Sequence, residues 1–101
     1  MVREIINKLS YNLVGDIGGT NARFALLVPG ESELICIKTL QCREFETVQE
    51  AIKSYLSSVD DAEIISACIA SAGTTHLDIF KPANNDWIIN KANVSSALND
   101  I

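Results

Sequence analysis

Two largely apolar segments joined by a very short polar link constrain the fold of this chain more than any other feature of its sequence. Residues 11–16 and 23–28 are the two segments, and little more than a Gly-Gly-Thr-Asn stretch at 18–21 separates them. A connection of this length favours antiparallel pairing of two adjacent strands. The sequence therefore predicts a β-hairpin with a glycine-rich tip.

The segments that follow predict a third strand and then a helix. Pro29-Gly30 suits a tight turn, because proline presets φ and glycine accepts a positive φ, and residues 33–40 are typical of a third strand. Thr47 followed by Glu50 forms a capping box. Apolar side chains then recur at helical spacing, at Val48, Ala51, Ile52, Tyr55, Leu56 and Val59.

A near-continuous run of apolar and small residues follows the helix. It covers residues 64–72 and closes at Gly73. Such runs are typical of a strand covered on both faces, as in a sheet that receives a helical crossover, so we expect this strand in the interior of the sheet and Cys68 in the core. The order predicts an α/β fold, a ribonuclease-H-like lobe with three antiparallel strands and then a helical crossover to a parallel strand.

Shorter elements are predicted at both ends of the chain. Trp87 is interpreted as a core residue that packs against the sheet. The expected elements are a lead-in helix within 1–10, a strand over 77–80 that Lys81-Pro82 ends, an extended segment at 87–89 and a helix over 91–98 capped by Asn90.

Composition narrows the classes of function. The 101 residues suit one small domain, and a net charge of −5 without a basic cluster disfavours nucleic-acid binding. No segment is long and apolar enough to span a membrane, and the first residues do not form a secretory signal. The chain has an odd number of cysteines, and none of them form a C-x-x-C pair. This pattern favours reduced thiols at Cys36, Cys42 and Cys68. We therefore expect a cytoplasmic protein without a nucleic-acid or membrane partner.

The hairpin tip carries the residue types of a phosphate site. Glycines let backbone N–H groups approach an anion closely, and Thr20 and Asn21 add side-chain donors. Asp16 stands where the strand gives way to the loop, and a carboxylate beside a phosphate requires a cation between them. The alternative is an ordinary hairpin whose glycines only permit a tight turn. We expect residues 15–21 to form the turn, with Gly18 or Gly19 at positive φ.

A longer match favours the phosphate site. Residues 13–26 contain Asp-Ile-Gly-Gly-Thr, which resembles the phosphate-1 loop of the sugar-kinase, Hsp70 and actin superfamily. The continuation Asn-Ala-Arg-Phe-Ala-Leu resembles bacterial glucokinases in particular. The resemblance implies that Asp16 organises Mg²⁺, directly or through water. It also implies that ATP phosphates bind to Gly15, Asp16, Ile17, Gly18, Gly19, Thr20 and Asn21.

Two further stretches support the resemblance. Residues 67–73 resemble the glucokinase strand that ends in Ala-Gly-Pro, with Thr74 in place of the proline. Residues 84–87 resemble the family's Thr-Asn-x-x-Trp, with Ala83 in place of the threonine. By resemblance, the loops that contain Gly73 and Asn84 lie on the sugar side of the active site.

The resemblance implies that residues 1–101 form the small N-terminal lobe of a glucokinase whose second lobe lies outside the chain. Such enzymes transfer the γ-phosphoryl group of ATP to the 6-hydroxyl of glucose, with Mg²⁺. Their general base stands in an Asn-Asp-Phe motif, which we expect beyond Ile101. Asn99-Asp100 follows Trp87 too closely to be that motif, and Ile101 replaces the phenylalanine. No catalytic residue is therefore expected within this chain.

Three hypotheses remain open at this stage. The chain is a lobe of a glucokinase, a non-enzymatic nucleotide-binding or regulatory module of the same fold, or a lobe of a kinase for another hexose. An Asn-Asp-Phe motif shortly after residue 101 would favour the first. The implied partners are glucose or another hexose and the C-terminal lobe, and a homodimer is left open.

Overall fold

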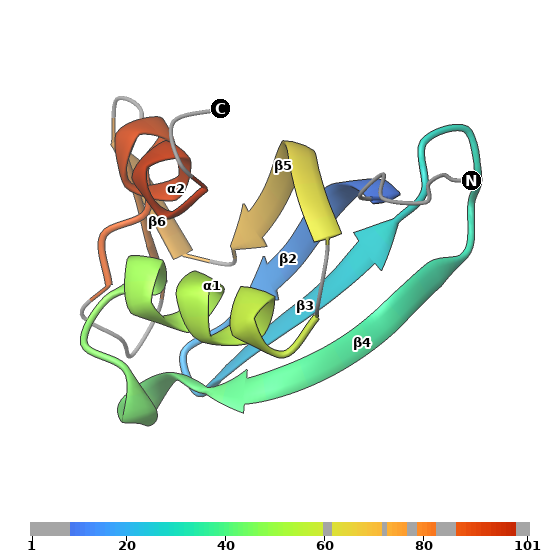
Figure 1. Cartoon of the computed structure of the whole chain (residues 1–101). Helices are drawn as coiled ribbons and strands as arrows, with labels where there is room; N and C mark the ends of the chain where they lie inside the picture. Colours follow the sequence, from blue (N-terminus) through green and yellow to red (C-terminus); the bar gives the residue numbers. More distant parts are fainter. Residues whose placement is uncertain (1–8, 60–61, 72, 77–78, 83–86, 99–101) are drawn as a thin grey trace, which may run out of the picture.

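The computed structural model describes residues 9–59, 62–71, 73–76, 79–82 and 87–98, and these form a mixed sheet with helices (Figure 1). Three antiparallel strands come first, and a helical crossover then leads to a strand parallel to the first, as predicted. The elements in chain order are β2 (Leu9–Ile17), β3 (Asn21–Leu27), β4 (Leu34–Gln41), the short 3-10 helix η1 (Cys42–Glu44), α1 (Val48–Ser57), β5 (Ala62–Ser71), β6 (Gly73–His76), β7 (Ile79–Pro82) and α2 (Lys91–Ala97).

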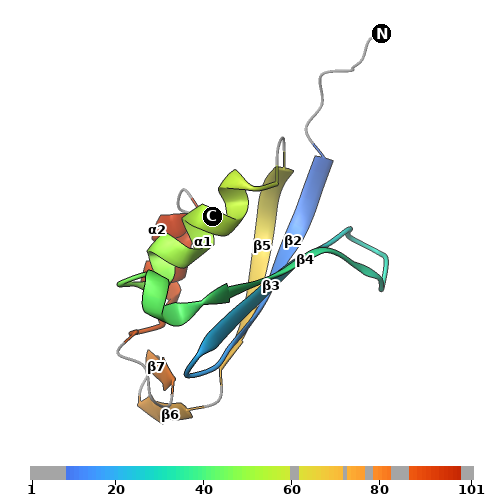
Figure 2. The same cartoon turned by 90° about the horizontal axis from the view of Figure 1, so that it is seen from below.

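The sheet has the strand order β4-β3-β2-β5. Helices α1 and α2 pack together on one face, and the view in Figure 2 shows no described helix on the other. The prediction that the parallel strand lies in the interior of the sheet was wrong, because β5 is the last of the four described strands.

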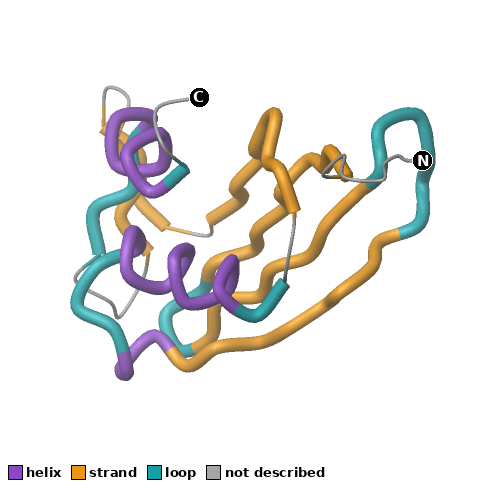
Figure 3. Tube along the Cα trace, viewed as in Figure 1, coloured by secondary structure: helices purple, strands orange, loops and turns teal. Residues whose placement is uncertain are grey.

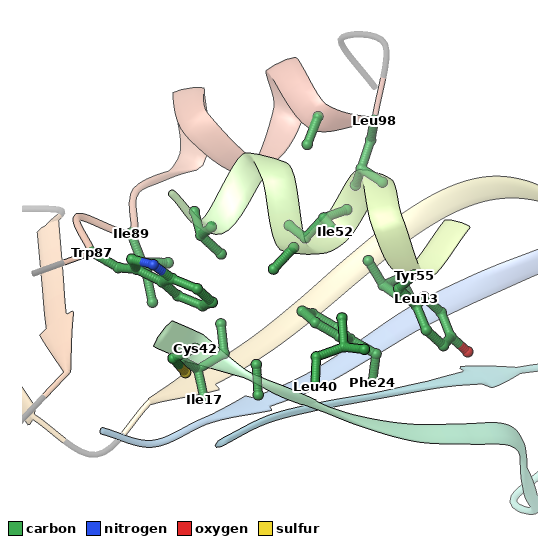
Figure 4. Close-up of a cluster of buried hydrophobic side chains, with 14 of the residues drawn as sticks. Leu13, Ile17, Phe24, Leu40, Cys42, Ile52, Tyr55, Trp87, Ile89 and Leu98 are labelled. Atoms are coloured by element: carbon green, nitrogen blue, oxygen red, sulfur yellow. The ribbon is translucent and has the colours of Figure 1, made fainter. Parts of the chain in front are cut away.

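One face of the sheet and one face of α1 make the core. Leu13 and Ile17 of β2 are fully buried, in keeping with the alternation of side chains along a strand. They meet Val48, Ile52 and Tyr55 of α1, which recur at helical spacing and are also fully buried (Figure 4). Burying each such side chain contributes about 1.5–3 kcal/mol, so this interface provides most of the apolar stabilisation that positions the hairpin beneath the helix.

Both helices begin at the predicted caps. The Thr47 hydroxyl accepts a hydrogen bond of 3.2 Å from the Glu50 N–H, and the Asn90 side chain accepts one of 2.8 Å from the Asn93 N–H. The carboxylate of Glu50 accepts from the N–H of Glu46 at 3.0 Å. In the usual capping box that reciprocal bond comes from the cap residue itself, so this box is shifted by one residue.

The outer strand β5 is much more exposed than its apolar sequence predicted. Ile64 is buried, but the neighbouring Ile65 is 49% exposed and Cys68 is exposed. The predictions that both faces of this strand are covered and that Cys68 is a core residue were therefore wrong for the described part of the chain. Cys68 pairs with Val14, which alternates with the buried Leu13, so Cys68 lies on the face that the helices do not cover. Ile65 falls at the irregularity in the register between β2 and β5.

The ends of the described chain differ in part from expectation. Leu9 and Ser10 extend β2 rather than a lead-in helix, and residues 1–8 lie outside the described residues. Lys81 and Pro82 do not end a strand at Phe80, because they pair with Thr74 and Gly73 in the β6–β7 hairpin. The missing N–H of a proline is tolerated at the edge of a sheet, and β7 has no partner other than β6 in the two-stranded sheet that the structure describes.

The segment before α2 confirms the interpretation of Trp87. Its indole is buried, and Nε1 donates a hydrogen bond of 3.0 Å to the carbonyl of Phe45. The indole therefore ties the start of α2 to the loop that leads into α1. None of the helices in the described residues is long and apolar enough to cross a membrane.

Candidate phosphate-binding loop

The connection between β2 and β3 is shorter than predicted. Gly15, Asp16 and Ile17 still belong to β2, where they pair with Phe24, Arg23 and Ala22. Only Gly18, Gly19 and Thr20 link the two strands (Figure 3). The Gly18 N–H donates a hydrogen bond of 2.8 Å to the Asn21 carbonyl, which closes the turn. The loop is therefore a compact tip on a regular hairpin.

The glycines of this tip are not needed for their left-handed conformations. The glycine with positive φ among the described residues is Gly30, at 86°, in the turn after β3. The prediction of a positive φ at Gly18 or Gly19 was wrong, because the turn closes without a left-handed residue. A Cβ at Gly18 would lie 3.7 Å from the Asn21 carbonyl oxygen, which is ordinary contact. Backbone geometry alone would therefore permit a side chain at Gly18.

Side-chain packing, rather than backbone conformation, requires a glycine at position 15. A Cβ there would lie 2.7 Å from Cδ1 of Ile69 and 3.1 Å from Cε1 of Phe24. The absence of a side chain lets the Phe24 ring lie across β2 and reach the Tyr55 ring, at 5.4 Å between ring centroids. Gly15 thus shapes the sheet under α1, and the structure shows this role beside the phosphate contact that the resemblance implied.

Asp16 and Ile17 face opposite sides of the sheet, as neighbours on a strand do. Ile17 is fully buried in the core and Asp16 is exposed, so the Asp16 side chain lies on the face of the sheet opposite to the core. In the part of the chain that the structure describes, the Asp16 carboxylate forms no hydrogen bond or ion pair. An exposed, uncommitted carboxylate beside the loop has the right donor chemistry for a hard cation such as Mg²⁺.

A metal at this place would need ligands from elsewhere. No group of three or more histidine, cysteine, aspartate or glutamate side chains could hold a metal ion within the described residues. Mg²⁺ typically takes one or two carboxylates and completes its shell with water and phosphate oxygens. The single carboxylate of Asp16 fits that mode of binding, so the residues present are compatible with a metal that arrives with the nucleotide.

Cys42 was missed by the sequence reasoning, although it contacts the tip directly. Its backbone N–H donates a hydrogen bond of 2.9 Å to the Thr20 carbonyl, and its Sγ lies 3.6 Å from the Gly18 carbonyl oxygen, as a hydrogen-bond donor. The residue is buried and lies beside Ile17 (Figure 4). Only its position directly after an apolar strand could have drawn attention to it.

The carboxyl ends of the two parallel strands lie together at the loop. Ile17 at the end of β2 pairs with Ser71 at the end of β5. Ligands of open α/β sheets bind outside the carboxyl ends of parallel strands, so the loop occupies a favourable edge. Gly73, a predicted sugar-side residue, begins β6 and pairs with Pro82. Asn84, the other, lies outside the described residues.

Comparison with known proteins agrees with the fold. The family model described as Glucokinase matches residues 13–99. The glucokinase of Hahella chejuensis is 44% identical over 93 residues, which make up 92% of this chain and 29% of that protein. The glucokinase of Yersinia pestis (strain Pestoides F) is 38% identical over 89 residues, or 88% of this chain and 27% of that protein.

A solved structure supports the same assignment. The crystal structure of a glucokinase from an Antarctic psychrotroph superposes with a TM-score of 0.79 at 30% sequence identity. The match covers 90% of this chain and 30% of that one, so the chain spans less than a third of the proteins it resembles. The family model covers the loop, both helices and most of the sheet, and on this evidence the chain belongs to the glucokinase family.

Proposed function

We propose that this chain provides the nucleotide-phosphate and metal side of an active site that phosphorylates glucose. The single observation that carries the proposal is the exposed Asp16 carboxylate next to the three-residue tip at the carboxyl ends of β2 and β5. Membership of the glucokinase family supports the proposed reaction, which is transfer of the γ-phosphoryl group of ATP to glucose with Mg²⁺. The remaining active-site residues, including the general base, are proposed to lie outside residues 1–101.

The proposed roles of Asp16 and the loop residues follow from the charge of ATP and of the chain. ATP brings several negative charges to a chain whose own net charge is −5. Asp16 would orient Mg²⁺ bound to ATP through a water ligand, and the metal would supply the compensating positive charge. Gly18 and Gly19 leave space for phosphate oxygens to reach the backbone, and the exposed side chains of Thr20 and Asn21 donate hydrogen bonds. Gly15 and Ile17 hold the loop on the sheet.

The sugar side is proposed to lie at the loops that follow β5 and β7. Gly73 is two residues beyond Ser71, which pairs with Ile17 at the phosphate edge of the sheet. Donors from the loops of Gly73 and Asn84 would then face the sugar while the hairpin tip faces the nucleotide.

We place the protein in the cytoplasm. Its three cysteines are free thiols, and free thiols are typical of proteins in this reducing compartment.

A chimera tests the proposal. Residues 13–99 would replace the matching segment of the Hahella chejuensis glucokinase, and ATP-dependent phosphorylation of glucose would be followed in a coupled assay. We expect the chimera to be active and its Gly18→Val variant to lose ATP affinity, because the valine side chain fills the space for phosphate. Ser32→Val, in the exposed loop at the opposite end of β3, is the control. Equal ATP affinity of Gly18→Val and the parent would contradict the proposal.

A further inference from the structure

Cys42 holds both ends of the hairpin tip although it lies more than twenty residues away in sequence. Its N–H donates to the Thr20 carbonyl at 2.9 Å and its thiol donates to the Gly18 carbonyl at 3.6 Å. Thus one buried residue, the first of η1, binds the first and the last residue of the connection between β2 and β3. We infer that Cys42 is a positioning residue that sets the direction of the loop amide groups toward nucleotide phosphate.

The geometry of the peptide bond makes this contact directional. The carbonyl of one residue and the N–H of the next point in opposite directions across a trans peptide, and the described chain contains no cis peptide. Because the Gly18 carbonyl faces the Cys42 thiol, the N–H of Gly19 points away from it. Among the described residues, no acceptor takes a hydrogen bond from that N–H. Cys42 therefore presents a free donor at the tip.

The need for such a contact comes from the composition of the tip. Glycine loses more conformational freedom on ordering than any other residue, so a Gly-Gly pair that must hold one conformation for a ligand is costly to order. The Gly18–Asn21 hydrogen bond closes the turn but does not by itself prevent rotation of the Gly18–Gly19 peptide about its neighbouring bonds. The two contacts from Cys42 restrict that rotation before any nucleotide arrives, which lowers the cost of binding.

This inference rests on the proposed phosphate-binding role of the loop, and two variants separate the contacts. Cys42→Ala removes the thiol and keeps the backbone N–H. Cys42→Pro removes both donors. Proline suits this position because Gln41 is extended, at φ −90° and ψ 124°, and Cys42 is the first residue of η1. Cys68→Ala is the matched control, since it deletes an exposed thiol from β5.

Two measurements, both on the chimera with the Hahella chejuensis glucokinase and on its variants, decide the matter. The order parameter of the Gly19 amide is measured by ¹⁵N relaxation without nucleotide, and the affinity for ATP with Mg²⁺ by calorimetry, both well below the melting temperature of each variant. We expect Cys42→Ala to lower the order parameter and weaken ATP binding about 2- to 10-fold, as for one lost hydrogen bond, with a larger loss for Cys42→Pro. Cys68→Ala should change neither quantity.

The outcomes separate the inference from the function on which it rests. Unchanged Gly19 order and unchanged ATP affinity in both Cys42 variants, in a chain that binds ATP, would overturn the positioning role. A lower melting temperature with unchanged order would overturn it as well, because that is the behaviour of a residue that only fills the core. Loss of Gly19 order in a chimera that shows no ATP binding would support the contact and refute the phosphate role.

Discussion

The phenolic hydroxyl of Tyr55 donates a hydrogen bond of 2.8 Å to the carbonyl of Cys36, and so joins α1 to the outer strand β4. Cys36 has a φ of 54°, a left-handed conformation at a residue that is not glycine. The bond and the unusual φ coincide near the irregular register between β3 and β4. Helix α1 is therefore hydrogen-bonded to β4 near the place where the pairing of β4 with β3 becomes irregular.

The first prediction concerns the pH dependence of stability at Tyr55. Burial of the phenol and, second, the charge of the neighbouring Cys36 raise its pKa to about 12 from 10.0. Between these values the unfolded chain releases the proton while the folded chain keeps it, so the free energy of unfolding should fall as pH rises from about 10 to about 12. Urea titrations of the parent and Tyr55→Phe across this range check it, and an equal slope in both would contradict it.

The second prediction concerns the strain at Cys36. A left-handed conformation costs a side-chain-bearing residue about 1–2 kcal/mol, and glycine avoids that cost. Glycine is also more flexible in the unfolded chain, which offsets part of the gain. Cys36→Gly should therefore stabilise the chain slightly or leave it unchanged, whereas Gly30→Ala, at a φ of 86°, should destabilise it. Thermal melting of the two variants tests this contrast, and clear destabilisation by Cys36→Gly would refute it.

The third prediction separates the packing glycine from the loop glycine. Gly15→Ala places a Cβ 3.1 Å from Cε1 of the fully buried Phe24 ring and 2.7 Å from the movable Cδ1 of Ile69, and should cost about 1–3 kcal/mol of folding free energy. Gly18→Ala meets only ordinary contact at 3.7 Å and should change stability by less than about 0.5 kcal/mol while weakening ATP binding. Denaturant melts and ATP titrations of the two variants should show opposite patterns. A larger loss of stability for Gly18→Ala would disprove the assignment.

The fourth prediction concerns the exposed carboxylate of Asp16. Asp16→Asn keeps the size of the side chain and removes the charge that orients Mg²⁺. In the chimera described above, this variant should need more Mg²⁺ for half-maximal rate and should turn over more slowly. Glu31→Gln, in the exposed turn at the far end of β3, is the matched control for loss of one surface charge. A parental rate for Asp16→Asn at limiting Mg²⁺ would exclude the metal role.

The fifth prediction concerns β5, the outermost strand beyond β2. Of the described strands, β2 is the one that pairs with it, and Ile65 and Cys68 are exposed on its surface. Unpaired strand edges that carry apolar residues favour association between chains. The 101-residue chain should therefore self-associate weakly, and Ile65→Lys should reduce this association. Sedimentation at several concentrations measures it, and a monomer at all concentrations would argue against it.

Local features of the sequence were sufficient for the order and type of the main elements. The Pro29-Gly30 turn and the caps at Thr47 and Asn90 act over three or four residues, so their chemistry is visible in the sequence itself. The short link after Ile17 likewise determined that β2 and β3 are antiparallel. The motif also located the glycine-rich tip between these strands, although the turn is shorter than the predicted residues 15–21. The phosphate-binding role of the tip stays a prediction.

Tertiary structure alone decided which faces and edges those elements present. The apolar run of β5 was expected inside the sheet, but the strand order leaves it outermost, and Cys68 is exposed. The packing role of Gly15 depends on Phe24 and Ile69, and the contact of Cys42 with Gly18 spans 24 residues. Periodicity and turn chemistry report only neighbours along the chain, whereas these contacts exist because the folded sheet brings distant residues together.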